Sequence, residues 1–111
     1  MGFHKLNKHI IDGGIINMVY TVTIEKDLNN KLEAIRSVNF KEYTLFSKKV
    51  EEMQNHARIM KNHKTKFNSF DKPLQDFKWV EFNNKIIVFT INPLKQTMHL
   101  CDYLPKEDVF E

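Results

Sequence analysis

Three side chains that could take part in acid–base or nucleophilic chemistry alternate along one short segment near the C-terminus. They are His99, Cys101 and Tyr103, each two residues from the next. If residues 97–104 form a β-strand, this spacing places all three on one face, because side chains alternate between the two faces of a strand. An imidazole beside a phenol could exchange protons with an RNA 2′-hydroxyl or a phosphate oxygen. The pattern therefore indicates a general acid–base site on this strand.

The sequence gives less support to a thiol nucleophile or a metal centre. Cys101 is the only cysteine, which is typical of a reducing compartment and favours the cytoplasm. No loop resembling an oxyanion hole adjoins it, and a buried cysteine is commonly a small hydrophobic residue. The five histidines are scattered and form no C-x-x-C or H-E-x-x-H motif. We therefore expect no metal ion and no other cofactor.

A second group of residues could hold the phosphates of a nucleic acid. These basic residues follow the outer face and the end of a predicted helix and are Lys48, Arg58, Lys61, Lys64 and Lys66. Phe67 and Phe70 follow and could stack on bases. The formal net charge of +3 is modest, however, so a solvated helix surface explains the same residues. The charge pattern does not decide between RNA binding and simple solvation.

The length and composition point to one globular domain with an extension. A chain of 111 residues is long enough for one hydrophobic core, and no stretch approaches the ~20 apolar residues of a membrane helix. Residues 1–17 read as a flexible N-terminal extension with a joint at Gly13-Gly14, and their apolar pieces are too short for a signal peptide. Residues 18–111 read as a single α+β domain without a membrane partner.

The first half of that domain is predicted to contain one strand and two helices. β-Branched residues favour a strand over residues 19–24. Asp27 could cap a short helix, and Asn39 with Glu42 resembles the capping box of a second one over residues 41–61. The core-facing stripe of the second helix recurs at helical spacing and consists of Phe46, Val50, Met53, Ala57 and Met60.

The second half is predicted to be a three-stranded antiparallel meander. Residues 77–82, 85–91 and 97–104 are strand-like, and the turn signals Asn83-Asn84 and Asn92-Pro93 separate them. The middle segment is apolar at both parities, which is typical of a central strand covered on both sides. The order is thus β-α-α-β-β-β, which predicts an α+β fold with an antiparallel sheet packed against two helices.

This order, together with two sequence segments, resembles the RelE/ParE toxin superfamily. The segments are residues 71–76, which precede a strand, and the following hairpin residues 79–82. The resemblance covers residues 19–110. It is closest to the YafQ-like branch, whose ending H-x-D-L-F is similar to residues 106–110 here, with Asp108 and Phe110 matching by position.

The resemblance implies a small toxin of a type II toxin–antitoxin pair. Such a toxin has a protein antitoxin as its partner and cleaves mRNA on the ribosome without a metal, by attack of a ribose 2′-hydroxyl on the adjacent phosphate. The implied catalytic residues are His99 and Tyr103 as proton carriers, with Lys106, Asp108 and Phe110 in the tail. Lys72, Lys78 and Lys106 are the implied cations near the phosphate.

Two positions depart from the family pattern and favour a second hypothesis. Lys106 stands where the branch has a catalytic His, and Glu81 stands where the family usually has Arg. A lysine with its ordinary pKa near ~10.4 stays protonated at neutral pH and cannot simply replace a histidine. The alternative is a non-enzymatic protein of the same fold, such as a degenerate toxin or a phage or mobile-element factor that binds RNA or a protein. A plain interaction module is a third possibility.

Overall fold

The computed structural model describes residues 10–11, 15–16, 20–59 and 67–110. Within the predicted N-terminal extension, two short strands, β1 (Ile10–Ile11) and β2 (Ile15–Ile16), pair antiparallel. The flexibility predicted for residues 1–17 concerns mainly residues outside the described ranges. Tyr20, the first residue of the described range 20–59, is buried.

The two predicted helices are α1 (Lys26–Val38) and α2 (Phe40–Ile59). α1 begins one residue before the expected cap Asp27, which lies in its first turn, and Glu25 occupies the N-cap position. The predicted capping box of α2 is half formed: the backbone N–H of Glu42 donates to Asn39 Oδ1 at 3.1 Å. Met60, the last residue of the predicted stripe, lies outside the described residues.

The main sheet has five strands in the order β3-β7-β6-β5-β4. Their bounds are β3 (Thr21–Ile24), β4 (Asn68–Ser69), β5 (Lys78–Phe82), β6 (Lys85–Asn92) and β7 (Thr97–Pro105). The predicted meander β5-β6-β7 is confirmed, and Asn83 and Asn84 have the positive φ values of 57° and 59° that a two-residue hairpin turn requires.

Two features of the sheet were not predicted. β3 pairs with β7 in parallel, so the sheet is only mostly antiparallel. The two helices between β3 and the meander form the long crossover that a parallel pairing requires. In addition, Asn68–Ser69 adds a short edge strand, β4, to the segment that was expected to be a connection.

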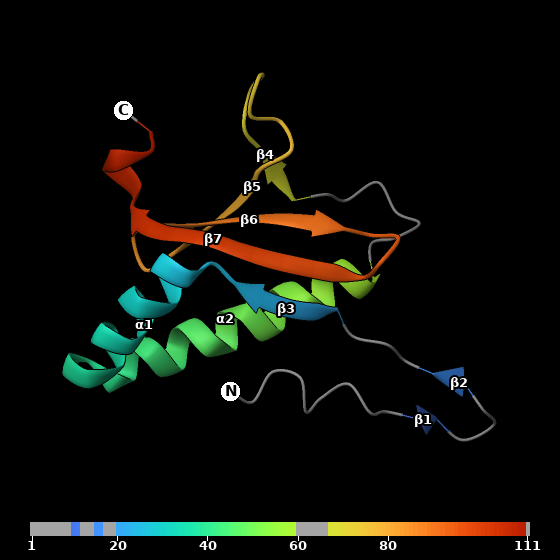
Figure 1. The fold of residues 1–111 in the computed structure, drawn as a ribbon, viewed down its shortest axis with the longest axis horizontal. Helices are drawn as coiled ribbons and strands as arrows, with labels where there is room; N and C mark the ends of the chain where they lie inside the picture. Colours follow the sequence, from blue (N-terminus) through green and yellow to red (C-terminus); the bar gives the residue numbers. More distant parts are fainter. Residues whose placement is uncertain (1–9, 12–14, 17–19, 60–66, 111) are drawn as a thin grey trace.

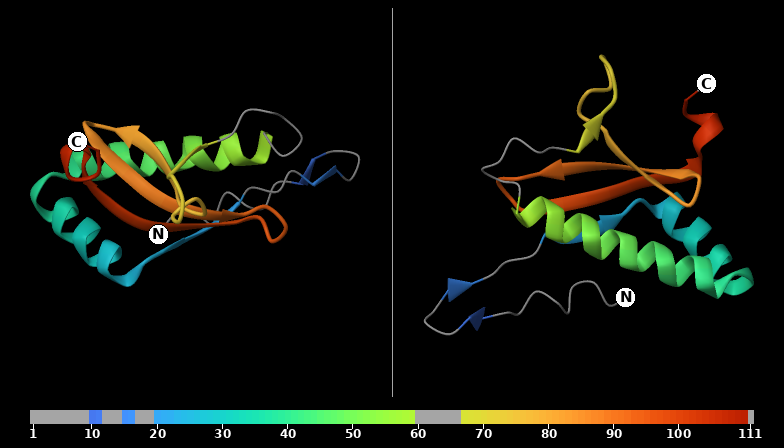
Figure 2. Two further views of the ribbon diagram at one scale, coloured as in Figure 1. Left: turned by 90° about the horizontal axis from the view of Figure 1, so that it is seen from above. Right: turned by 180° about the vertical axis from the view of Figure 1, so that it is seen from behind.

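Both helices contribute to one hydrophobic core on one face of the sheet. In Figure 1 the helices lie below β6 and β7, and Figure 2 shows α2 in front when the molecule is seen from behind. The buried core residues are Tyr20, Leu28, Leu32, Phe46, Val50, Met53, Ala57, Ile87, Phe89, Met98, Leu100 and Tyr103. The predicted α+β fold is therefore confirmed, and the opposite face of the sheet, here called the open face, is available for a site.

The central strand β6 is buried on both faces, as its sequence predicts. Ile87 and Phe89 lie in the helix-side core, whereas Ile86 points to the open face and is also 0% exposed. Ile86 pairs with Leu104, and the chain beyond Leu104 forms a short 3₁₀ helix, η3 (Lys106–Asp108), at the end of β7. The C-terminal tail thus returns to the open face.

Candidate functional site

A β-bulge in β7 separates the side chains that were expected to share one face. Phe89 pairs with Leu100 and Val88 pairs with Asp102, so Cys101 is an extra residue in the ladder. One extra residue reverses the alternation of side chains beyond it. Tyr103 consequently joins Leu100 in the helix-side core, whereas His99 stays on the open face. The predicted shared face is wrong, because strict alternation along the sequence cannot reveal a bulge.

Tyr103 belongs to a partly buried polar cluster between α2 and the hairpin of β5 and β6. Its hydroxyl donates to Glu42 Oε2 at 2.8 Å, and Lys85 Nζ donates to the same oxygen at 2.8 Å. Lys85 Nζ also lies 4.8 Å from the centre of the Tyr103 ring. Burial and the neighbouring carboxylate raise the pKa of Tyr103, so the phenol stays protonated. A catalytic role would require this phenol to leave its cluster.

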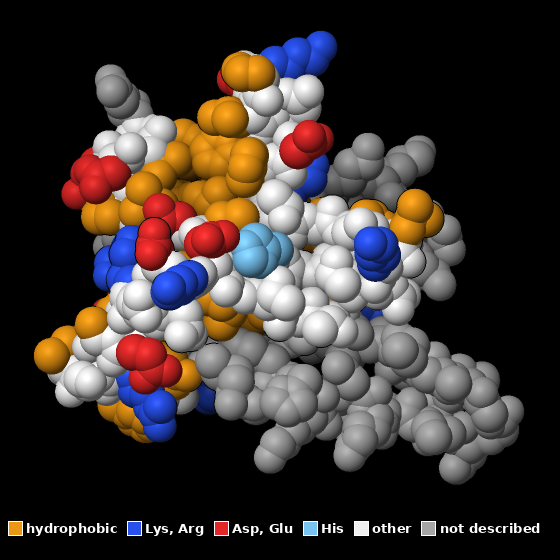
Figure 3. Space-filling view, viewed as in Figure 1, with side chains coloured by type: hydrophobic (Ala, Val, Ile, Leu, Met, Phe, Trp, Pro, Cys, Tyr) orange, Lys and Arg blue, Asp and Glu red, His pale blue; other side chains and the backbone are white. Residues whose placement is uncertain are grey.

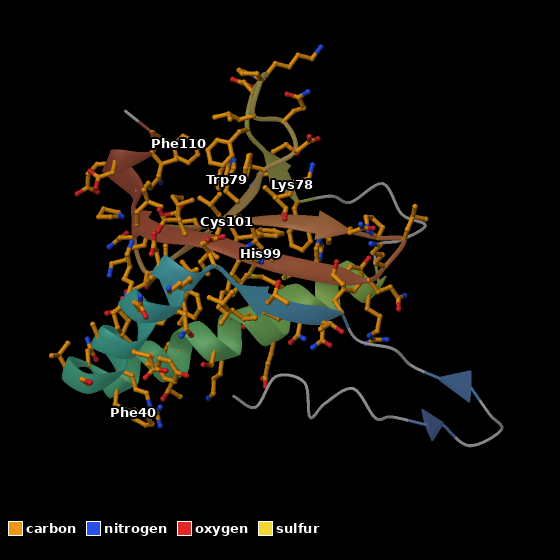
Figure 4. All side chains as sticks on the ribbon, viewed as in Figure 1. Phe40, Lys78, Trp79, His99, Cys101 and Phe110 are labelled. Carbon is orange, nitrogen blue, oxygen red and sulfur yellow. The ribbon has the colours of Figure 1, made fainter. Side chains whose placement is uncertain are left out.

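His99 is held on the open face by two side chains, one from β3 and one from the residue that follows β3. Its Nδ1 lies 2.7 Å from Thr23 Oγ1, and its Nε2 lies 3.1 Å from Glu25 Oε1. Thr23 is directly opposite His99 in the parallel pairing of β3 and β7, and Glu25 follows β3. Figure 4 shows His99 and Cys101 near the middle of β7. Thr23 and Glu25 were not predicted, because their proximity depends on that parallel pairing.

Cys101, although next to this group, is poorly suited to act as a nucleophile. Burial, and secondly the charge of Glu25, raise the pKa of its thiol. The thiol also donates to the backbone carbonyl oxygen of His99, with 3.6 Å between Sγ and O. Because the thiolate is the reactive form, these surroundings oppose thiol catalysis, in line with the expectation from the sequence.

The two residues that depart from the family pattern contact each other. Lys106 Nζ of η3 lies 3.2 Å from Glu81 Oε1 of β5, and the two side chains are about half exposed. The backbone N–H of Lys106 donates to the carbonyl of Asn84 at 3.1 Å, which fixes the tail to the β5–β6 turn. The negative charge gained at one position is therefore balanced by the positive charge at the other.

The remaining tail residues border an apolar hollow on the open face. The hollow has a volume of about 460 Å³ and is lined by Phe70, Leu74, Phe77, Val88, Asp102, Leu104, Asp108 and Val109. Figure 3 shows hydrophobic side chains gathered between the tail and the β4–β5 loop, close to the histidine. Phe110 packs beside the hollow, with its ring centre 4.7 Å from that of Trp79 and 6.0 Å from that of Phe70. We call this hollow the open-face groove.

The groove carries negative charge at two places. Asp102 Oδ1 accepts hydrogen bonds from Lys31 Nζ at 2.9 Å and from the backbone of Tyr103 at 2.7 Å. Asp108 is exposed, and no described residue forms a hydrogen bond or ion pair with its carboxylate. A ligand of this groove therefore meets apolar walls and at least one available carboxylate.

The predicted cations do not gather around His99. Lys48 and Arg58 are on α2, which covers the opposite face of the sheet, and Lys72 is exposed in the loop before β5. Lys78 Nζ donates to Ser69 Oγ at 2.8 Å and to the carbonyl oxygen of Gln75 at 3.4 Å. Lys61, Lys64 and Lys66 lie outside the described residues. None of the described candidate cations lines the open-face groove: Lys72 lies in the loop that carries Phe70 and Leu74, and Lys106 lies in η3 between Leu104 and Asp108.

No helix among the described residues is long and apolar enough to span a membrane. In the same ranges, no three His, Cys, Asp or Glu side chains are grouped so that they could hold a metal ion.

No protein family and no curated protein matches the chain by sequence, but several solved structures match it in three dimensions. A double arginine-to-alanine mutant of Escherichia coli toxin RelE in the free state is 14% identical, with a TM-score of 0.58 over 83% of this chain and 88% of the other. The archaeal RelE–RelB complex from Pyrococcus horikoshii gives 12% identity and a TM-score of 0.55 over 80% and 97%.

The chain has the RelE toxin fold. A metal-bound toxin from Helicobacter pylori also matches the structure of this chain, with 17% identity and a TM-score of 0.57 over 82% of this chain and 99% of the other. The resemblance to RelE seen in the sequence is thereby confirmed for the fold, whereas the YafQ-like branch stays a prediction. Within this fold, His99 and the open-face groove lie on the face that α1 and α2 leave uncovered.

Proposed function

We propose that the protein is the toxin of a type II toxin–antitoxin pair and that it cleaves mRNA. The RelE fold supports the toxin assignment, and one observation supports the cleavage: an imidazole, His99, is oriented at both ring nitrogens on the uncovered face of the sheet. Its side chain is 39% exposed, so a ribose can reach it. An oriented and accessible imidazole is the most common general base of enzymes.

The proposed chemistry needs no metal ion. His99 takes the proton of a ribose 2′-hydroxyl, the 2′-oxygen bonds to the adjacent phosphorus, and the bond from phosphorus to the 5′-oxygen breaks. The leaving 5′-oxygen takes a proton from water, and the products are a 2′,3′-cyclic phosphate and a 5′-hydroxyl end. Lys106 is placed to hold a neighbouring phosphate of the RNA, because the adjacent Pro105 pairs with Lys85 whereas His99 pairs with Thr90, five residues further along β6. Such a phosphate competes with Glu81 for the Lys106 ammonium group. Lys48, which is exposed on α2, is available for a second RNA contact, such as a ribosomal surface.

The proposed protein partner is the antitoxin, and the open-face groove supports it. The walls of the groove are mostly aliphatic and aromatic, and Leu74 at its border is 51% exposed. A peptide segment with apolar side chains and a nearby Lys or Arg complements these walls and the carboxylate of Asp108. An antitoxin segment of that chemistry would cover the same face that carries His99.

The test is controlled expression of the full chain in a bacterial host, with growth and primer extension on abundant mRNAs measured together. We expect growth arrest and new discrete 5′ ends. His99→Ala should lower cleavage by about 10²- to 10⁴-fold, the usual contribution of a general base. His56→Ala on α2 is the matched control, because this histidine packs on Phe67 with 4.7 Å between ring centres and does not face the site. Unaltered cleavage by His99→Ala would exclude His99 as the base.

A second candidate function is RNA or protein binding without cleavage. The ion pair between Glu81 and Lys106 favours it, because it neutralises Lys106, the one Lys or Arg of residues 105–110. Under this alternative, expression of the protein leaves mRNA intact. Arrest of growth without new 5′ ends would instead indicate a toxin with another target.

A further inference from the structure

The hydrogen bonds of His99 define which ring nitrogen carries its proton when the imidazole is neutral. A carboxylate can only accept, so the bond between His99 Nε2 and Glu25 Oε1 requires a proton on Nε2. The other nitrogen, Nδ1, then has a free lone pair, and Thr23 Oγ1 at 2.7 Å must donate to it. The three side chains thus form a hydroxyl–imidazole–carboxylate series, the arrangement that activates hydroxyl groups in many enzymes.

Main-chain hydrogen bonds fix the backbone positions of both partners of His99. Thr23 and His99 are register partners in the sheet, so their side chains emerge side by side on the open face. The backbone N–H of Glu25 donates to the carbonyl of Leu100 at 2.8 Å, and the carbonyl of Glu25 accepts from the N–H of Asn29 at 2.8 Å. Glu25 is therefore fixed between the sheet and the first turn of α1, which limits the positions that its carboxylate can adopt.

We infer that Glu25 is a positioning residue that directs the basic Nδ1 of His99 toward a hydroxyl group. This inference rests on the proposed function and names the group that the site receives, a ribose 2′-hydroxyl. In the free protein the Thr23 hydroxyl occupies the place of that group. On cleavage the 2′-hydroxyl gives its proton to Nδ1, and the Glu25 carboxylate stabilises the imidazolium cation that results. Glu25 itself does not touch the RNA.

The first test is a ¹⁵N NMR measurement of the His99 ring in the full chain, which reports the proton position without any substrate. We expect Nε2 protonated and Nδ1 unprotonated at neutral imidazole. Glu25→Gln should shift the balance toward the other tautomer, because an amide can donate as well as accept. Thr23→Val should shift the ¹⁵N resonance of Nδ1 from its wild-type position. Thr23→Ser, which keeps the hydroxyl group, should leave that resonance near the wild-type position. A proton on Nδ1 of the wild-type ring would overturn the inference.

The second test separates the inference from the proposed function. In a cleaving protein, Glu25→Gln should lower kcat by about 10- to 100-fold, less than the ~10⁴-fold loss at a buried triad carboxylate, with KM unchanged. Asp27→Asn, which removes a carboxylate from the first turn of the same helix, is the matched control and should leave kcat unaltered. A changed tautomer with an unchanged kcat would overturn the positioning role. The expected tautomer in a protein that cleaves no RNA would instead refute only the proposed ribonuclease function.

Discussion

At the scale of single residues, the contact between Glu81 and Lys106 alters how the two departures from the family pattern are understood. Taken one at a time, each departure removes an expected catalytic or basic group. Taken together, they form one exposed ion pair with 3.2 Å between Nζ and Oε1. An exposed pair of this kind contributes only about 0–1 kcal/mol to stability, so a phosphate can displace Glu81 at little cost. The positive charge is thus relocated to the tail and remains usable.

Glu81→Gln should therefore strengthen binding to RNA. The change releases Lys106 from its partner, so one more cation can contact a phosphate and the slope of log K against log salt should steepen by about 1. Filter binding of a short single-stranded RNA over a salt series measures both quantities. Glu33→Gln is the matched control, because Glu33 pairs with Arg36 on α1 at 3.7 Å. Equal slopes for both variants would show that Lys106 does not reach RNA.

At the scale of elements, the bulge in β7 decides which side chains meet. Cys101 is the surplus residue, since Leu100 and Asp102 already pair with the consecutive residues Phe89 and Val88. Removing Cys101 leaves those pairs intact and gives a regular ladder. Removing a residue from a regularly paired strand, in contrast, shifts one part of that strand by one position and exchanges the two faces of that part.

A chain lacking Cys101 should accordingly fold with Tyr103 still in the core. We expect its thermal midpoint to change by no more than about 8 °C, which corresponds to roughly 1 kcal/mol in a domain of this size. A chain lacking Val88, in the middle of the neighbouring strand β6, should fail to unfold cooperatively, because the buried residues on one side of it, Ile86 and Ile87 or Phe89, would exchange faces. Circular dichroism melting of the two deletion variants distinguishes them. An equal loss of thermal stability in both would contradict a bulge at Cys101.

The cluster around Glu42 joins three elements, namely α2, β6 and β7. Hydrogen bonds from Lys85 and Tyr103 lower the pKa of Glu42 in the folded state. A carboxyl group with a lowered folded-state pKa stabilises the protein above its unfolded-state pKa, near ~4.3. That stabilisation is lost as the pH falls through the folded-state pKa.

Glu42→Gln should cost about 1–3 kcal/mol of unfolding free energy at neutral pH, because it weakens three hydrogen bonds, from Lys85, Tyr103 and Asn83, to a mostly buried carboxylate. The difference from the wild type should shrink as the pH is lowered below ~4. Urea titrations at several pH values measure it. Glu52→Gln on the same helix is the control, since Glu52 is 71% exposed and its pair with Lys49 is at the surface. A difference that stays constant with pH would mean that the Glu42 charge is not the source of the stability.

At the scale of the whole molecule, the two faces of the sheet have different roles. The helices cover one face and complete the core, whereas the other face carries His99, the tail and the open-face groove. Two exposed leucines differ in their relation to this groove. Leu74 borders it and Leu94, which is 97% exposed, lies in the β6–β7 turn away from it.

Leu74→Lys should weaken binding of the proposed antitoxin, which is to be sought among the products of neighbouring short reading frames. The change removes an apolar contact and places a positive charge where a basic partner residue approaches, so we expect Kd to rise at least about tenfold, or roughly 1.4 kcal/mol. Leu94→Lys should leave Kd unchanged. Isothermal titration calorimetry of both variants provides the comparison. Equal affinities of the two variants for the antitoxin would show that it does not bind in this groove.

The sequence by itself determined the features that depend on near neighbours in the chain. The apolar spacing from Phe46 to Ala57 predicted α2, and Asn83-Asn84 predicted the hairpin turn, because a helix period and a positive φ are properties of a few adjacent residues. The element order, together with residues 71–76 and 79–82, indicated the RelE fold, which the solved structures confirm.

Only the tertiary structure decided the composition of the candidate site. Thr23 and Glu25 precede His99 by 76 and 74 residues, and they reach it because β3 pairs in parallel with β7. Tyr103 does not share the open face with His99, because one surplus residue, Cys101, reverses the alternation of side chains beyond it. Strand pairing and bulges depend on how the whole sheet closes over the helices, so the side chains that meet across strands cannot be deduced from the spacing within one strand.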